Sequence, residues 1–135
     1  KVSRDYFLEL YHGPTCAFKD IALTLLPHLM TLSMSYNNID KDIVILAATS
    51  GDTGKAALEG FKNVDNTKVI VFFPKDGVSP IQKLQMQSQE GNNTYVVAVE
   101  GNFDDCQSFV KEFFNSNKDL SLSSANSINI ARLAP

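Results

Sequence analysis

The sequence has little of what a metal site or a disulfide framework requires. Its 135 residues include only two cysteines, Cys16 and Cys106, which lie far apart and form no CxxC pair. We therefore expect each cysteine to be a small buried hydrophobic residue. The two histidines, His12 and His28, lack the spacing of metal ligands on a helix. The sequence thus predicts no metal site.

Strong charge and long apolar runs are also missing. The formal net charge is only -3, and both signs are spread along the chain, so the basic patch of a nucleic-acid-binding protein is absent. No apolar run approaches the length that spans a bilayer, and residues 1–7, KVSRDYF, lack the apolar segment of a secretory signal. We expect a cytoplasmic protein that binds neither nucleic acid nor a membrane.

With 44% hydrophobic and 20% charged residues, the composition is that of one soluble globular domain with a real core. We therefore predict a single domain over residues 1–135. The chain starts with a lysine rather than a methionine, and it stops at ARLAP, where a helical pattern is under way. We expect it to be a piece of a longer protein.

Hydrophobic periodicity predicts alternating helices and strands. Phe18, Ile21, Ala22, Leu25 and Leu29 recur at helical steps, and Pro27 is expected to kink or break that helix. The apolar run 42–49 predicts a strand covered on both faces, 68–74 predicts a second buried strand and 94–100 a third strand. Residues 120–124 are a weaker fourth candidate, followed by the start of a helix over 125–133. The alternation predicts an α/β domain of three layers: a parallel sheet of about four strands with helices on both faces.

Two further helices have recognisable starts. Ser79, Pro80 and Gln82 form the pattern of a capping box in front of the helix that Gly91 closes. In the loop 100–105, Asp104 and Asp105 fall in a first helical turn, where carboxylates complement the helix dipole. We interpret that loop as a helix cap rather than a ligand site.

The loop ATSGDTG, residues 48–54, is the sharpest local feature, because ligands of such sheets bind beyond the carboxyl ends of the strands. Gly51 and Gly54 allow a tight turn and a close approach to a ligand, and free amides at the following helix start attract an anion. An ordinary strand-to-helix turn explains the same residues equally well. In the later loop 123–129, Asn126 and Ser127 suit either helix capping or ligand binding.

Lys19 is the candidate reactive group. Most lysines are solvated surface charges. Lys19, however, is expected near a helix start with Cys16 and Phe18 beside it, and both the dipole and apolar neighbours would favour the neutral, nucleophilic amine. Lysines that form Schiff bases are activated in this way.

Five blocks of sequence together resemble the threonine synthase family, whose members have the tryptophan synthase β-like fold. The blocks are LYHGPTCAFKD, TSGDTGKAAL, FFPKDGVSPIQKLQM, GNFDDCQSFVK and SANSINIARL. The resemblance covers nearly the whole chain. It implies a lyase of threonine biosynthesis that uses pyridoxal 5'-phosphate to convert O-phospho-L-homoserine and water to L-threonine and phosphate.

The resemblance also implies roles for individual residues. Lys19 would form the Schiff base with the cofactor and act as the catalytic residue, with Asp52 and Asn126 also at the cofactor. The substrate would be bound by Ser50, Gly51, Thr53, Ser127 and Asn129. Related enzymes often have asparagine in place of Asp52, so its carboxylate is expected to bind hydroxyls or amides rather than the substrate carboxylate. Lys55 and Arg132 are candidates for binding the leaving phosphate.

The chain also departs from the family. Threonine synthases are considerably longer, and the glycine-rich loop that binds the cofactor phosphate lies outside this chain. The resemblance is therefore to the small, mobile domain, and we expect the remainder of the enzyme as its partner and no useful turnover from the piece alone. Two alternatives stay open: another enzyme of the same cofactor family, such as a serine or threonine dehydratase or a cysteine synthase, and a non-catalytic phosphate- or nucleotide-binding α/β module.

Overall fold

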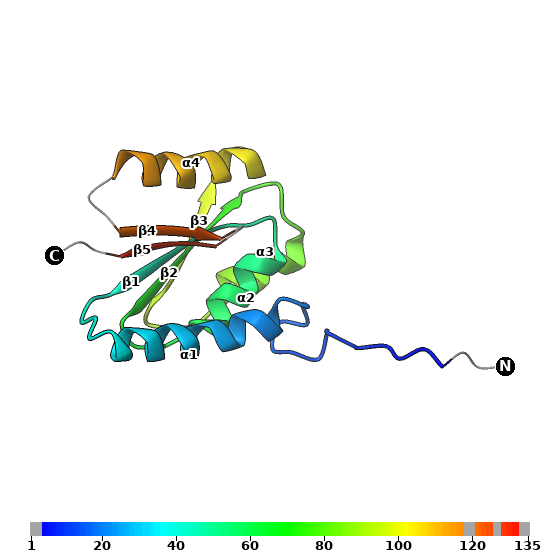
Figure 1. Cartoon of the computed structure of the whole chain (residues 1–135). Coiled ribbons are helices and arrows are strands. Elements are labelled where there is room, and N and C mark those ends of the chain that lie inside the picture. The colour runs from blue at the N-terminus through cyan, green and yellow to red at the C-terminus, as the bar shows by residue number, and fades with distance from the viewer. Residues whose placement is uncertain (1–3, 118–120, 126–127, 133–135) are drawn as a thin grey trace.

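The computed structural model describes residues 4–117 with their side chains, and 121–125 and 128–132 as backbone. Four helices and five strands follow one another along the chain (Figure 1). They are α1 (Asp20–Tyr36), β1 (Ile43–Ala48), α2 (Asp52–Gly60), β2 (Thr67–Pro74), α3 (Pro80–Gln87), β3 (Thr94–Val99), α4 (Phe103–Ser116), β4 (Ser121–Ala125) and β5 (Ile128–Arg132).

The sheet has the strand order β3-β2-β1-β5-β4. β1, β2 and β3 are parallel, whereas β5 is antiparallel to both β1 and β4. The α/β class and the four expected strand regions are confirmed, but the described sheet has a fifth strand. The helix predicted over 125–133 is wrong, because residues 128–132 pair with the edge of β1. Alternation of isoleucine with asparagine and alanine in that segment has the two-residue period of a strand.

The helices cover both faces of the sheet, as predicted. α1, α2 and α3 lie on one side and α4 on the other (Figure 1). Side chains of β1 alternate between the two cores: Ile45 and Ala47 join the first, and Leu46 and Ala48 join the second. The first core also holds Phe61, which is fully buried. Burying one such side chain contributes roughly 1.5–3 kcal/mol, so the two cores fix the three layers.

The second core contains Cys106, whose burial was predicted and is confirmed. Burial, and secondarily the charge of Asp105, raises the pKa of the Cys106 thiol. Cys16 is exposed, so its predicted burial is wrong. The reason is local: Cys16 lies in a turn in front of α1, with its backbone in the left-handed region at φ 58°.

At the amino ends of the strands, the side chain of Asn93 ties three segments together. Its amide nitrogen donates to the carbonyl oxygens of Phe61, Val64 and Thr67 at 2.8, 3.3 and 3.0 Å. Its oxygen accepts from the Asn63 amide at 2.8 Å. One side chain therefore joins the end of α2, the start of β2 and the start of β3 through groups that are costly to leave unpaired.

α1 differs from expectation in two ways. It continues through Pro27 as one helix of 17 residues, so the predicted break is wrong. The predicted stripe is on the outer side, because Phe18, Ile21, Leu25 and Leu29 are between 54% and 60% exposed. The buried residues of the helix are instead Asp20, Leu23, Pro27 and Met34.

Pro27 explains how closely α1 and α2 pack. A proline has no N–H, so the carbonyl of Leu23, four residues earlier, has no helical donor. That carbonyl faces Gly60 at the end of α2, where an added Cβ would lie 2.1 Å from the Leu23 oxygen. The contact therefore requires a glycine.

We predict that Gly60→Ala lowers the free energy of unfolding by about 1–3 kcal/mol, because the backbone of α1 must move to admit the methyl group. Chemical denaturation of the full-length protein measures the change. Lys111→Ala, an exposed substitution on α4, is the control and should shift stability by no more than about 0.5 kcal/mol. Equal stability of both variants would contradict the packing described.

Candidate functional site

A pocket of about 250 Å³ lies at the carboxyl end of β1. It brings the two segments singled out in the sequence to one place, since Lys19 and the loop 48–53 both line it. Its lining residues are Lys19, Ala48, Thr49, Ser50, Asp52, Thr53, Gln82 and Phe103. Lys19 therefore lies across the pocket from the loop that follows the first buried strand.

Lys19 is the N-cap residue of α1 and is partly buried. Its Nζ lies 4.4 Å from the centre of the Phe18 ring, a cation–π geometry. Phe18 is itself 59% exposed, so the ring shields one side of the amine only. The amine is therefore accessible from the pocket.

The turn in front of Lys19 is built on Asp20, a residue that sequence reasoning missed. The Asp20 carboxylate is buried and accepts hydrogen bonds from the Thr15 amide at 2.9 Å and from the Thr15 hydroxyl. Gly13 packs on the same carboxylate, where a Cβ would lie 2.4 Å from Oδ2. Buried carboxylates need such partners, so these contacts fix the backbone on both sides of Lys19.

Thr49 shapes the loop opposite Lys19. Its buried hydroxyl accepts hydrogen bonds from the amides of Gly51 at 3.0 Å and Gly54 at 2.9 Å. Gly51 has a φ of 154°, which side chains rarely allow, and a Cβ on Gly54 would lie 2.4 Å from the Thr49 methyl group. The conformation of the loop therefore depends on Thr49, Gly51 and Gly54 together.

The loop leaves donors for a ligand. Of the first four amides of α2, those of Gly54 and Lys55 are bonded to Thr49 Oγ1 and to the Gly51 carbonyl. Among the described residues, the amides of Asp52 and Thr53 have no such partner. Beside them, Ser50 and Thr53 line the pocket. The arrangement suits an anionic group, as predicted for the loop.

Asp52 is held by Gln82 of α3. Its Oδ1 accepts a hydrogen bond from Gln82 Nε2 at 2.7 Å, and Gln82 Oε1 accepts from the Ser79 hydroxyl at 3.0 Å. The predicted N-cap is confirmed, since Ser79 Oγ accepts from the Gln82 amide. The Gln82 side chain, however, bonds the Ser79 hydroxyl and Asp52 rather than the Ser79 amide. It therefore belongs to the pocket, although the sequence indicated only a cap.

The other predicted caps and ligands lie elsewhere. Asn102 and Asp105 form a complete capping box at α4, which confirms the interpretation of that loop as a helix cap. Phe103, the residue after Asn102, lines the pocket. Lys55 bonds Gln89 and lies 3.8 Å from Glu59, and it does not line the pocket.

The C-terminal candidates are only partly placed. The backbone of Asn129 pairs with Leu46 in β1, two residues before Ala48. Arg132 pairs with Ile43, five residues and about 16 Å from the end of β1 that borders the pocket. Asn126 and Ser127 lie outside the described residues.

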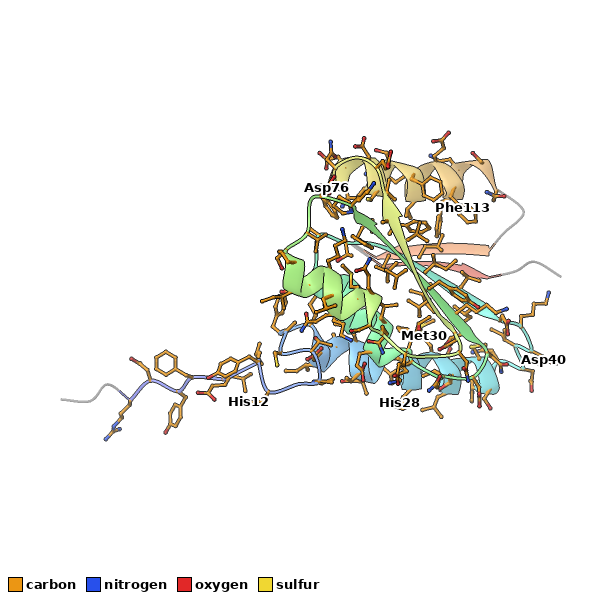
Figure 2. The ribbon with its side chains drawn as sticks, turned by 180° about the vertical axis from the view of Figure 1, so that it is seen from behind. His12, His28, Met30, Asp40, Asp76 and Phe113 are labelled. Atoms are coloured by element: carbon orange, nitrogen blue, oxygen red, sulfur yellow. The ribbon has the colours of Figure 1, made fainter. Side chains whose placement is uncertain are left out.

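The described residues contain no group of three histidine, cysteine or carboxylate side chains that could bind a metal. His12 lies on the N-terminal segment and bonds Glu9, while His28 is exposed on α1 (Figure 2). Within that same part of the chain, no helix is both long and apolar enough to cross a membrane.

Comparison with known proteins adds a specific similarity. No protein-family model matches the chain. It is 45% identical over 132 residues to the threonine synthase of Pseudomonas aeruginosa, a match that covers 96% of this chain and 28% of that protein. Among solved structures, the threonine synthase of Brucella melitensis with bound pyridoxal phosphate superposes with a TM-score of 0.79 at 47% identity, over 89% of this chain and 26% of that one. Yeast threonine synthase superposes with a TM-score of 0.76 at 38% identity, over 82% and 23%.

Fold and pocket together are those of an α/β domain with a polar pocket at the carboxyl end of its central strand. The particular enzyme that the chain resembles is threonine synthase, in sequence and in structure, and the resemblance indicated by the five motifs is thereby confirmed. The chain spans about a quarter of the length of these relatives.

We predict that Thr49→Val lowers the free energy of unfolding by about 1–3 kcal/mol, because two loop amides lose their acceptor while the side-chain shape is kept. Denaturation of the full-length protein tests this. Thr94→Val is the matched control: its hydroxyl makes only an exposed bond of 3.4 Å, to Gly91, and its loss should cost no more than about 0.5 kcal/mol. If Thr49→Val costs no more than the control, the Thr49 hydroxyl does not support the loop.

Proposed function

We propose that the chain is part of a longer, pyridoxal-phosphate-dependent threonine synthase, which converts O-phospho-L-homoserine and water to L-threonine and phosphate. Within that enzyme it corresponds to the small, mobile domain. The observation that carries the proposal is the pocket in which Lys19 and the hydroxyl-bearing loop 49–53 meet. Similarity to threonine synthases over nearly the whole chain supports the choice of reaction.

The residues present fit the reactive side of the cofactor. An aldehyde needs an accessible primary amine, and Lys19 is the one lysine among the residues that line the pocket. When bound, pyridoxal phosphate withdraws electrons from the substrate carbons and so makes their C–H bonds acidic. Lys19 would carry the cofactor on Nζ, and Asp52 would lie at its edge.

Lys19 would have a second task as a proton carrier whenever its amine is free. Its free Nζ faces the pocket and can take a proton from one substrate carbon and return it to another. The Asp20 carboxylate and Thr15 hold the backbone at Lys19 in place during these transfers. Phe103, on the far side of the pocket, helps to keep water away from the reacting carbons.

The substrate carboxylate would bind at the start of α2. The amides of Asp52 and Thr53 and the hydroxyls of Ser50 and Thr53 are donors there, and Gly51 allows the backbone to come close. The hydrogen bond from Gln82 holds the Asp52 carboxylate toward α3, which reduces its repulsion of the substrate carboxylate. Asn126, Ser127 and Asn129 remain proposed contacts from the C-terminal segment.

The substrate is a small amino acid rather than a nucleic acid, a proposal that the weak net charge of -3 supports. We propose a cytoplasmic location from the same composition. The remainder of the enzyme supplies the site for the cofactor phosphate.

We predict that Lys19→Ala lowers kcat for phosphate release from O-phosphohomoserine by a factor of about 10²–10⁴ or more, since the proton-transferring amine is lost. Lys111→Ala, an exposed lysine on α4, should leave kcat unchanged. Borohydride reduction of the full-length protein should fix the cofactor on the peptide that contains Lys19. Label on a different lysine would overturn the assignment, and ammonia release from threonine without phosphate release would point to a dehydratase.

We predict that Gln82→Met raises KM for O-phosphohomoserine about 10-fold with a smaller change in kcat, because the released Asp52 carboxylate then turns toward the substrate carboxylate and weakens its binding. The double variant with Asp52→Asn should recover most of the loss. If the double variant is as impaired as Gln82→Met alone, repulsion by Asp52 is not the cause.

A further inference from the structure

The outer side of α1 carries a continuous line of large apolar side chains. We call it the α1 seam; it consists of Phe18, Ile21, Leu25, Leu29, Leu32 and Tyr36, which are 54% to 88% exposed. The spacing of three and four residues places the five members from Ile21 to Tyr36 on one face of the helix, and Phe18 lies in the turn directly before it. The opposite face, with Leu23, Pro27 and Met34, packs on the first core.

α1 turns no acidic, lysine or arginine side chain to water, and its exposed polar residues are only Thr24, His28, Ser33 and Ser35. Its only charged residue is Asp20, which is buried and bonded to Thr15. Helices at a protein surface normally turn charged residues to water, whereas a helix that is apolar on all sides is a buried one. α1 therefore has apolar residues on two opposite faces, and the exposed polar residues between them are uncharged hydroxyl-bearing residues and one histidine, a pattern that favours cover on the outer face as well.

The size of the seam supports the same conclusion. Six large side chains at these exposures present apolar area on the order of 700 Å². That exceeds the patches usual on monomeric proteins, about 300–600 Å², and is close to the roughly 800 Å² that each partner buries in a stable interface. α1 is also the outermost element on its side of the sheet, and none of the other described helices and strands covers its outer side (Figure 1).

The position of the seam indicates what covers it. It starts at Phe18, whose ring contacts the amine of Lys19, so a body on the seam lies next to the pocket. Lys19 is the only cation among the residues that line the pocket. The relatives are about four times as long as this chain, so most of such a polypeptide lies outside it.

We propose that the α1 seam is the surface on which the remainder of the parent polypeptide docks, through an apolar and uncharged face of its own. Docking covers Phe18 and so completes the wall of the pocket at Lys19. The inference rests on the proposal that the chain is part of a longer enzyme, but it does not depend on which reaction that enzyme catalyses.

Cysteine labelling of the full-length native protein tests the proposal. Leu29→Cys places a thiol in the middle of the seam, and Lys111→Cys places one on exposed α4 as the control. Iodoacetamide should modify the Leu29→Cys thiol about 100-fold more slowly than the control, because a covered thiol reacts only when the contact opens. In urea the two rates should become equal. Leu25→Cys repeats the measurement one turn away.

Two results would overturn the proposal. The first is modification of both seam thiols at the rate of the control in the native protein. The second is protection that disappears on dilution together with dissociation of a dimer, since a second copy rather than the same polypeptide would then cover the seam. Labelling needs no substrate, so loss of the predicted phosphate release with the seam still protected would refute the reaction and not the docking.

Discussion

The close contact between the Leu23 carbonyl and Gly60 is the constraint on which the site depends. Leu23 lies one helical turn after Lys19, so its contact with α2 sets where the first turn of α1 lies. α2 begins at Asp52, directly after the loop that Thr49 shapes. The two halves of the pocket are therefore held by one helix pair, and Pro27 and Gly60 are the two residues that allow the pair to approach.

Much of the fold was predictable because the relevant signals are local. The runs at 43–48 and 69–74 are apolar without interruption, which is enough to identify buried strands. The burial of α1 was not predictable in the same way. Both of its faces are apolar, so periodicity identifies a helix but does not say which face this domain covers. For β5, pairing with the edge of β1 decided between strand and helix, and that pairing depends on residues far away in the sequence.

The candidate site also combines residues that local sequence identifies with residues that only distant packing brings to the pocket. Lys19 and the loop after β1 were identified from their own neighbours in the sequence, together with the rule that ligands bind at the carboxyl ends of strands. Gln82 and Phe103 line the pocket from 30 and more residues beyond Asp52, and their side-chain directions follow from how α3 and α4 pack. The capping pattern at Ser79 did not reveal the contact between Gln82 and Asp52, because the same Gln82 side chain bonds both the Ser79 hydroxyl and the Asp52 carboxylate.

The hydrogen bonds of Asn93 have a consequence for how such a domain can change. They join three segments at the end of the sheet that lies opposite the pocket, so the strands keep their alignment whatever happens at the other end. The loops at the pocket end can then change in length or composition while the base of the sheet stays joined. A single asparagine side chain thus separates the part of the fold that carries the pocket from the part that keeps the strands in register.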